Sequence, residues 1–176
     1  SYESLGHVPT YSSWLAKQDW RPAYDRHRCN LQLIGLNDVG KRWVLKNPSH
    51  LFALDALFEV YPDALIVQTH RDPRALMASS CSLSALATAG YSTKFVGEVI
   101  GRDQLDMLGR GVSLFMQARA RHDPARFCDV QFEDLSRDPV GVVRSVYEAF
   151  GLRWTDPVRS AVEAEKAAAH SGPRAP

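Results

Sequence analysis

The fold is decided by residues 43–82, WVLKNPSHLFALDALFEVYPDALIVQTHRDPRALMASSCS. The pattern predicts a strand, a polar turn and a helix, and then the same three features again. In an open parallel sheet, ligands bind beyond the carboxyl ends of the strands, where helix N-termini point. Two basic turns, each before a helix, therefore predict a site for a highly anionic ligand. The cationic residues are Lys46 and His50 in the first turn and His70, Arg71 and Arg74 in the second.

Three segments are predicted to be strands, and predicted helices separate them. They are Trp43–Leu45, which ends at Lys46, then Ala64–Thr69, and then Arg126–Phe132. Strands that alternate with helices form parallel βαβ units with right-handed crossovers. Three strands are fewer than a stable doubly wound sheet usually has. The sequence therefore predicts an α/β fold, a parallel sheet flanked by helices, that is incomplete at its N-terminus.

Asp-Pro pairs mark three helix N-termini, at residues 72–73, 138–139 and 156–157. Aspartate is a good N-cap, and proline fits the first helical position because its missing N–H would be unpaired there anyway. Gly90 and Gly151 are expected to end the first two of these helices, since glycine favours the position after a helix.

Other helix signals are weaker. Thr10 is expected to cap a short helix, and Ser49 to cap the helix after the first basic turn. Residues 91–122 predict one or two helices with a break near Gly101. In that segment the helical spacing places four residues on one apolar face: Leu105, Leu108, Val112 and Phe115.

Composition bounds the possible functions. A chain of 176 residues is long enough for one domain with a sizeable core. A net charge of +1 argues against a general nucleic-acid binder, and no apolar run approaches the ~20 residues of a membrane span. Cys29, Cys81 and Cys128 lack metal-type spacing, so they are expected to be reduced core thiols in a cytoplasmic protein. No metal site is expected.

Arg71 and Ser79 form the first candidate site. Arg71 directly follows the predicted strand and Ser79 comes eight residues later, so the two could grip one phosphate from two sides. The alternative is that Arg71 forms an ordinary ion pair with Asp72 or Asp134 and that Ser79 is a packing residue.

Three ordered motifs resemble those of sulfotransferases that use 3′-phosphoadenosine 5′-phosphosulfate (PAPS), in particular the bacterial-type branch. THRDPRALMASS, residues 69–80, is similar to the family's 3′-phosphate-binding segment, in which an arginine and a serine eight residues later bind that phosphate. The K-x-P element at Lys46 and QFEDLSRDP, residues 131–139, match two more family motifs. The resemblance covers residues 43–157 and implies a P-loop-NTPase-like fold in which Arg71 and Ser79 bind the 3′-phosphate.

The resemblance also implies roles for the first turn and for Phe132. Lys46 matches the lysine that stabilises the bridging oxygen or the transferred sulfuryl group. His50 titrates near neutrality and is the candidate general base. Cytosolic relatives place their histidine two residues after the lysine, where this chain has Pro48, so a structural His50 or a carboxylate base elsewhere are alternatives. Phe132 stands where many relatives have a tyrosine that contacts adenine, so stacking or packing is expected there.

The predicted layout is a single sulfotransferase-like domain. Residues 1–42 form a helical acceptor-side segment, residues 43–157 the nucleotide-binding core, and residues 158–176 a terminal helix and loop. The Gly-rich phosphosulfate loop of the family is absent from this sequence and is expected upstream of Ser1. The tail HSGPRAP, residues 170–176, is the expected start of a Gly-containing segment that completes the 3′-phosphate pocket.

The predicted activity is transfer of a sulfuryl group from PAPS to a hydroxyl acceptor, which could be a small molecule, a carbohydrate or a lipid. The sequence does not indicate the oligomeric state. Two alternatives stay open: a P-loop kinase that uses ATP, and a non-catalytic interaction domain derived from the fold. The absence of G-x-x-x-x-G-K-[ST] counts against the kinase.

Overall fold

The computed structural model describes residues 2–38 and 40–171, with side chains as far as residue 168. The chain divides into two compact units, and each unit combines stretches that are separate in the sequence. The first unit comprises Ser1–Ala64 and Pro73–His122, and the second comprises Leu65–Asp72 and Asp123–Pro176. Of the predicted tail at residues 170–176, the first two residues end the last helix, and residues 172–176 lie outside the described residues.

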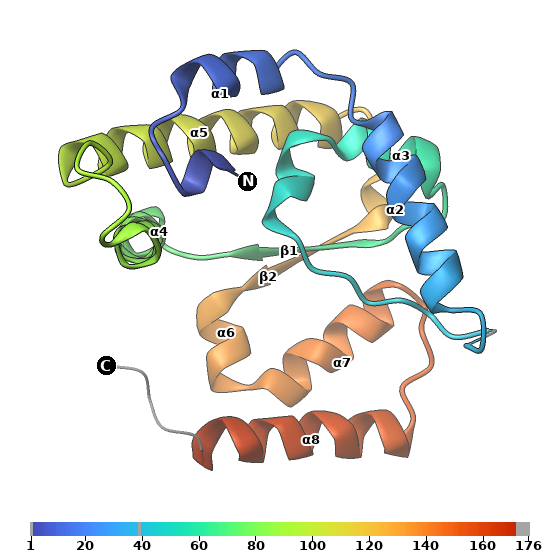
Figure 1. Cartoon of the computed structure of the whole chain (residues 1–176). Coiled ribbons are helices and arrows are strands. Elements are labelled where there is room, and N and C mark those ends of the chain that lie inside the picture. The colour runs from blue at the N-terminus through green and yellow to red at the C-terminus, as the bar shows by residue number, and fades with distance from the viewer. Residues whose placement is uncertain (1, 39, 172–176) are drawn as a thin grey trace. The chain divides into compact units, whose positions relative to one another are not determined.

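The first unit is helical (Figure 1). Its elements are η1 (Tyr2–Ser4), α1 (Pro9–Leu15), α2 (Arg21–Ile34), η2 (Pro48–Phe52), α3 (Leu54–Val60), α4 (Pro73–Thr88) and α5 (Glu98–Arg119). Leu54, Phe95 and Ile100 are at most 3% exposed and form the centre of its core. Each such side chain stabilises the fold by about 1.5–3 kcal/mol through burial. Helix α5 packs against η2, α3 and α4, so it organises this unit.

Helix α5 runs without a break from Glu98 to Arg119, so the predicted break near Gly101 is wrong. Its buried residues recur every three or four positions, as one face of a helix requires. They are Ile100, Gln104, Met107, Gly111, Phe115 and Ala118. The predicted apolar face was therefore right at Phe115 but wrong at Leu105 and Val112, which are more than half exposed.

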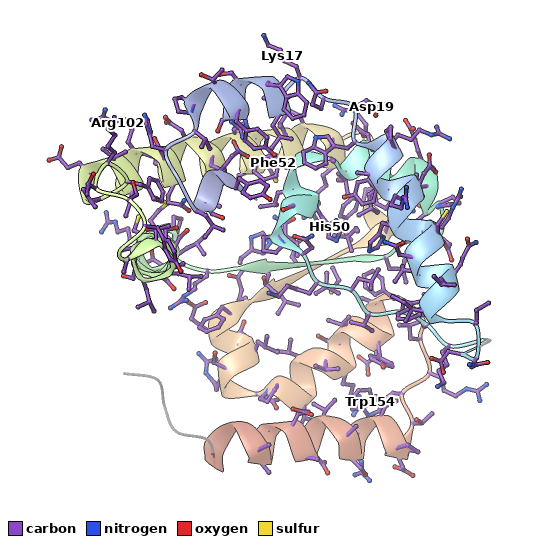
Figure 2. All side chains as sticks on the ribbon, viewed as in Figure 1. Lys17, Asp19, His50, Phe52, Arg102 and Trp154 are labelled. Atoms are coloured by element: carbon purple, nitrogen blue, oxygen red, sulfur yellow. The ribbon has the colours of Figure 1, made fainter. Side chains whose placement is uncertain are left out.

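Gly111 explains how η2 approaches α5 so closely. A Cβ atom at this position would lie 3.1 Å from the ring of Phe52, tighter than most real contacts. Phe52 projects from η2 toward α5, on the same short helix that carries His50 (Figure 2). Glycine at this helical position thus allows the segment after the first basic turn to pack on α5.

The predicted strand at Trp43–Leu45 is wrong. Residues 41–47 have no regular secondary structure, and Val44 is 92% exposed. A strand needs a neighbouring strand for its backbone hydrogen bonds. Within the described part of the chain, the sheet is two-stranded and does not include this segment.

Two predicted N-caps are also wrong. The side chain of Asn47 accepts a hydrogen bond from the N–H of Ser49 at 3.0 Å, so Asn47 caps η2 and Ser49 lies inside it. The chain then begins a separate helix, α3, at Leu54. Helix α1 begins at Pro9, which places Thr10 inside the helix and not at its cap.

The second unit contains a parallel strand pair (Figure 1). Its elements are β1 (Ile66–His70), η3 (Pro124–Arg126), β2 (Phe127–Gln131), α6 (Phe132–Arg137), α7 (Pro139–Ala149) and α8 (Asp156–Ser171). Helices α6 and α7 pack on β2, and α8 packs on α7. The parallel arrangement and two of the three predicted strands are confirmed, to within two residues at each end. The short helix α6 was not predicted.

The Asp-Pro signals predicted helix starts correctly. Helices α4, α7 and α8 begin at Pro73, Pro139 and Asp156. At the second of these, the Asp138 side chain accepts a hydrogen bond from the N–H of Gly141 at 3.1 Å. Gly90 and Gly151 follow the ends of α4 and α7 with φ of +84° and +60°, a conformation that favours glycine.

The three cysteines are free thiols. Cys29 is exposed, so its predicted place in the core is wrong, whereas Cys81 and Cys128 are partly buried. No helix in the described ranges is long and apolar enough to cross a bilayer.

Candidate active site

Arg71 and Phe132 lie together at the carboxyl edge of the sheet. The last residue pair in register is His70 with Gln131, so the next residue of each strand is Arg71 on one side and Phe132 on the other. The guanidinium carbon of Arg71 lies 4.7 Å from the centroid of the Phe132 ring. A guanidinium stacked on a ring keeps its N–H groups in its own plane, where they can bind an anion in a bidentate manner. Both residues are exposed, and Phe132 is 41% exposed.

The alternative partner of Arg71, Asp134, has a different role. It lies on α6 and accepts a hydrogen bond from Arg137 at 3.2 Å, within its own helix. In the described part of the chain, no salt bridge within 4.0 Å joins Asp134 to Arg71. The geometry therefore gives Arg71 the Phe132 ring as its neighbour and leaves the guanidinium edge accessible to a ligand.

His70 forms a hydrogen bond across the strand pair. Its Nε2 atom lies 2.7 Å from Oδ1 of Asp129 on β2. His70, one of the cationic residues of the second turn, therefore has its partner within the strand pair. The contact links the two strands one residue before Arg71 and thus stabilises the edge on which Arg71 and Phe132 lie.

Ser79 lies on α4 in the first unit, at an exposed position. Its neighbour Ser80 donates a hydrogen bond to Oε1 of Gln104 on α5 at 2.7 Å. Successive helical residues point about 100° apart, so Ser80 packs on α5 while Ser79 faces solvent. An exposed hydroxyl two turns into a helix is available to a ligand, which is what the predicted phosphate-binding role requires.

Lys46 and His50 flank the cap of η2 in the first unit. Lys46 is exposed and is the last residue before the capping Asn47. His50 is partly buried, and its Nδ1 atom lies 2.7 Å from the hydroxyl oxygen of Tyr24. The two rings are nearly parallel, with centroids 5.8 Å apart and an interplanar angle of 22°. The site therefore combines an exposed cation with a histidine held on one side.

A cluster of rings surrounds Tyr24, the partner of His50, and the sequence did not predict it. His27 and Tyr61 each meet the Tyr24 ring edge-on, with centroids 6.4 Å away. The Nδ1 atom of His27 lies 2.6 Å from the hydroxyl oxygen of Tyr61. Tyr24 and His27 are three residues apart on α2, a spacing that places them on one face and was a usable signal. The contact between Tyr24 and His50 depends on the packing of separate elements, which no sequence spacing encodes.

Burial sets the ionisation of this pair. Burial lowers the pKa of His50 below its usual value, and the nearby charge of His27 lowers it further. Burial raises the pKa of Tyr24 to about 12, with a further contribution from Tyr61. At neutral pH both groups are therefore neutral, and their hydrogen bond joins a phenol to an uncharged imidazole.

The described residues hold no group of three or more His, Cys, Asp or Glu side chains that could bind a metal ion.

A model of the sulfotransferase family matches residues 1–156 of this chain. The chain belongs to the sulfotransferase family. The match extends the resemblance from residues 43–157 to the N-terminal helices, which no quoted motif covered. Omega-hydroxy-beta-dihydromenaquinone-9 sulfotransferase Stf3 of Mycobacterium bovis is 31% identical over 122 residues, which cover 64% of this chain and 29% of that relative.

Two solved sulfotransferases share the fold. Sulfotransferase STF1 from Mycobacterium tuberculosis H37Rv, known from a crystal structure, is 58% identical in sequence to this chain, with a TM-score of 0.91 over 93% of this chain. Sulfotransferase STF9 from Mycobacterium avium is 27% identical, with a TM-score of 0.87 over 98% of this chain. The predicted α/β sulfotransferase fold is therefore confirmed. The chain spans 45% and 44% of the lengths of these two proteins.

Proposed function

We propose that this sulfotransferase chain takes part in moving a sulfuryl group from PAPS to a hydroxyl acceptor. The observation that carries the proposal is the Arg71 guanidinium stacked on Phe132, at the carboxyl edge of β1 and β2. Ligands of open α/β sheets bind at this edge. Family membership favours a sulfuryl donor over ATP, which was the donor in the kinase alternative.

In this proposal Arg71 and Ser79 bind the 3′-phosphate of the nucleotide. Arg71 supplies a charged, bidentate fork, and Ser79 supplies an uncharged donor. Phe132 holds the guanidinium by a cation–π contact and offers its exposed edge to the adenine. The motif positions support the assignments of Arg71 and Ser79, since these two residues stand where the family motif has its phosphate ligands.

The reaction needs charge neutralisation more than covalent chemistry from the protein. The acceptor oxygen attacks sulfur, the bond from sulfur to the 5′-phosphate oxygen breaks, and 3′-phosphoadenosine 5′-phosphate leaves with the electron pair. The acceptor proton is released. In this proposal Lys46 stabilises the negative charge that develops on the bridging oxygen. His50 lies four residues after Lys46 and can act either as a base or as a hydrogen-bond donor.

The acceptor we propose is a lipid alcohol. The support is the relative named for a menaquinone-derived compound that carries an omega-hydroxyl group. Carbohydrates and small alcohols are the comparison compounds in an acceptor screen. We place the reaction in the cytoplasm, in keeping with the three free thiols.

The proposal is tested by nucleotide binding to an Arg71→Ala variant. Loss of a charge-assisted pair should weaken binding of 3′-phosphoadenosine 5′-phosphate by about 2 kcal/mol, roughly 30-fold, in titration calorimetry. Arg144→Ala is the matched control, because Arg144 is an exposed arginine that pairs with Glu148 on α7. Equal affinity of the wild-type and Arg71→Ala proteins would remove Arg71 from the site.

Two further measurements separate the alternatives. ATP should compete poorly with the 3′-phosphorylated nucleotide, because it lacks the 3′-phosphate, whereas a kinase would prefer ATP. A non-catalytic domain would bind the nucleotide without transferring the sulfuryl group to any acceptor in the screen.

A further inference from the structure

We propose that Tyr24 is a positioning residue that donates its O–H to Nδ1 of His50 and thereby makes His50 a hydrogen-bond donor through Nε2–H. This inference rests on the proposed function, in which His50 acts near Lys46 either as a base or as a hydrogen-bond donor. It assigns a role to a residue outside the motifs, and it replaces the base role of His50 with that of a neutral donor.

The first step concerns the phenol. Tyr24 is 7% exposed, and its hydroxyl has Nδ1 of His50 as its hydrogen-bond partner among the described residues. A buried O–H without an acceptor is costly. If Nδ1 carried the proton, it would donate to the phenol oxygen, and the phenol O–H would have no acceptor among the residues that the structure describes. The pair is satisfied when the phenol donates and Nδ1 accepts.

The second step concerns the imidazole. A neutral imidazole has one protonated and one unprotonated nitrogen, so an accepting Nδ1 places the hydrogen on Nε2. The ring stays neutral at pH 7 because burial and the charge of His27 lower its pKa. His50 therefore presents an N–H group, and not a lone pair, on the side away from Tyr24.

The third step concerns rigidity. The Tyr24 ring is held edge-on by His27 and Tyr61, at interplanar angles of 87° and 86°. The hydrogen bond between His27 and Tyr61, at 2.6 Å, fixes these two neighbours in turn. Tyr24 is thus a preorganised support, and its hydroxyl determines both the orientation and the tautomer of His50.

A neutral N–H donor suits sulfuryl transfer. The oxygens of the sulfuryl and phosphate groups carry negative charge throughout the reaction. A fixed N–H group stabilises this charge by hydrogen bonding, without a proton transfer. An enzyme can use a neutral histidine in this way, to polarise a substrate oxygen, when the protein keeps the pKa of the imidazole low. The acceptor proton then passes to a carboxylate base, the alternative to His50, or to solvent.

The tautomer can be measured directly. Side-chain ¹⁵N NMR of the wild-type protein, with the His50 signal assigned by a His50→Gln variant, should show a protonated Nε2 and an unprotonated Nδ1 at neutral pH. Tyr24→Phe keeps the ring and removes the hydroxyl, so part of the His50 population should change to the other tautomer. Tyr61→Phe is the matched control, because it removes a hydroxyl that bonds His27 and should leave the His50 tautomer unchanged. A proton on Nδ1 in the wild-type protein would overturn the proposal.

Activity gives a second, independent readout. Glutamine can donate a hydrogen bond but cannot take up a proton, so His50→Gln should keep kcat within about 10-fold of wild type, whereas His50→Ala should lose about 100-fold. Equal loss in both variants would contradict the donor role. The NMR measurement needs no nucleotide, so its result on the His50 tautomer does not depend on whether the protein uses PAPS. The Arg71→Ala titration tests PAPS use separately.

Discussion

The two basic turns hold their functional side chains in different ways. At the second turn, backbone register places Arg71. Arg71 is the first residue after β1, and it lies over the ring of Phe132, the first residue after the parallel strand β2. At the first turn, His50 is placed by packing, since Tyr24 reaches it from another helix. The second turn therefore depends on local geometry, and the first turn depends on the core of the helical unit.

This difference suggests that the two turns have different roles in the reaction. The turn built on strand register holds a permanent charge, which we propose binds a nucleotide phosphate. The turn built on packing holds a neutral, partly buried imidazole beside an exposed lysine. We therefore expect substitutions at the second turn to affect binding and those at the first turn to affect the chemical step.

Lys46→Ala gives the largest expected effect and is the strongest test of this difference in roles. Removing one group that stabilises transition-state charge should lower kcat by about 100-fold, while the affinity for 3′-phosphoadenosine 5′-phosphate changes little. Steady-state kinetics and calorimetry on the same preparation measure both. Lys41→Ala is the control, because Lys41 is an exposed lysine paired with Asp38. A large loss of affinity with unchanged kcat would show that Lys46 belongs to the nucleotide-binding group.

Phe132→Leu gives an intermediate effect at the second turn. Leucine preserves an apolar side chain but removes the ring under the Arg71 guanidinium. Loss of an exposed cation–π contact should weaken nucleotide binding by about 0.5–1 kcal/mol, roughly 2- to 5-fold. In a Phe132→Leu, Arg71→Ala double variant the two losses of affinity should add only in part, because part of the effect of Phe132 acts through Arg71. Full additivity of the two changes would mean that Phe132 acts independently of Arg71.

The pH dependence of stability gives the smallest expected effect and tests the packing at the first turn. The pKa of His50 is lower in the folded chain than its ordinary value of 6.5, so between these two values the unfolded state binds more protons. The free energy of unfolding should therefore decrease as the pH falls below about 6.5. The titratable groups that act on this histidine are Tyr24, which bonds its Nδ1 atom, and His27, whose charge lowers its pKa.

Urea unfolding of the wild-type and His50→Gln proteins between about pH 5 and pH 8 measures this contribution. Glutamine does not titrate, so the difference in unfolding free energy between the two proteins should shrink toward acid pH. A difference that is constant with pH would show that His50 is not buried as a neutral ring.

Much of the second turn could be predicted from the sequence. The β-branched run before Thr69 and the Asp-Pro pair at residues 72–73 are local signals, and both act through the backbone of a few consecutive residues. They predicted the strand, the turn and the helix that follows. Arg71 and Ser79 became candidates because one directly follows the predicted strand and the other lies eight residues later in the predicted helix. The sulfotransferase family was predicted in the same way, from three motifs in sequence.

Only the tertiary structure decided the first turn. Trp43–Leu45 has the composition of a strand but lies outside the sheet in the described chain, because a strand exists only with a hydrogen-bonded neighbour. The contact between Tyr24 and His50 joins residues on α2 and η2, and the buried face of α5 depends on which neighbours it meets. Sequence determined the short-range elements and the motif chemistry, because these depend on neighbouring residues. The orientation of His50, and with it the tautomer that we propose, comes from contacts between distant segments, which only packing brings together.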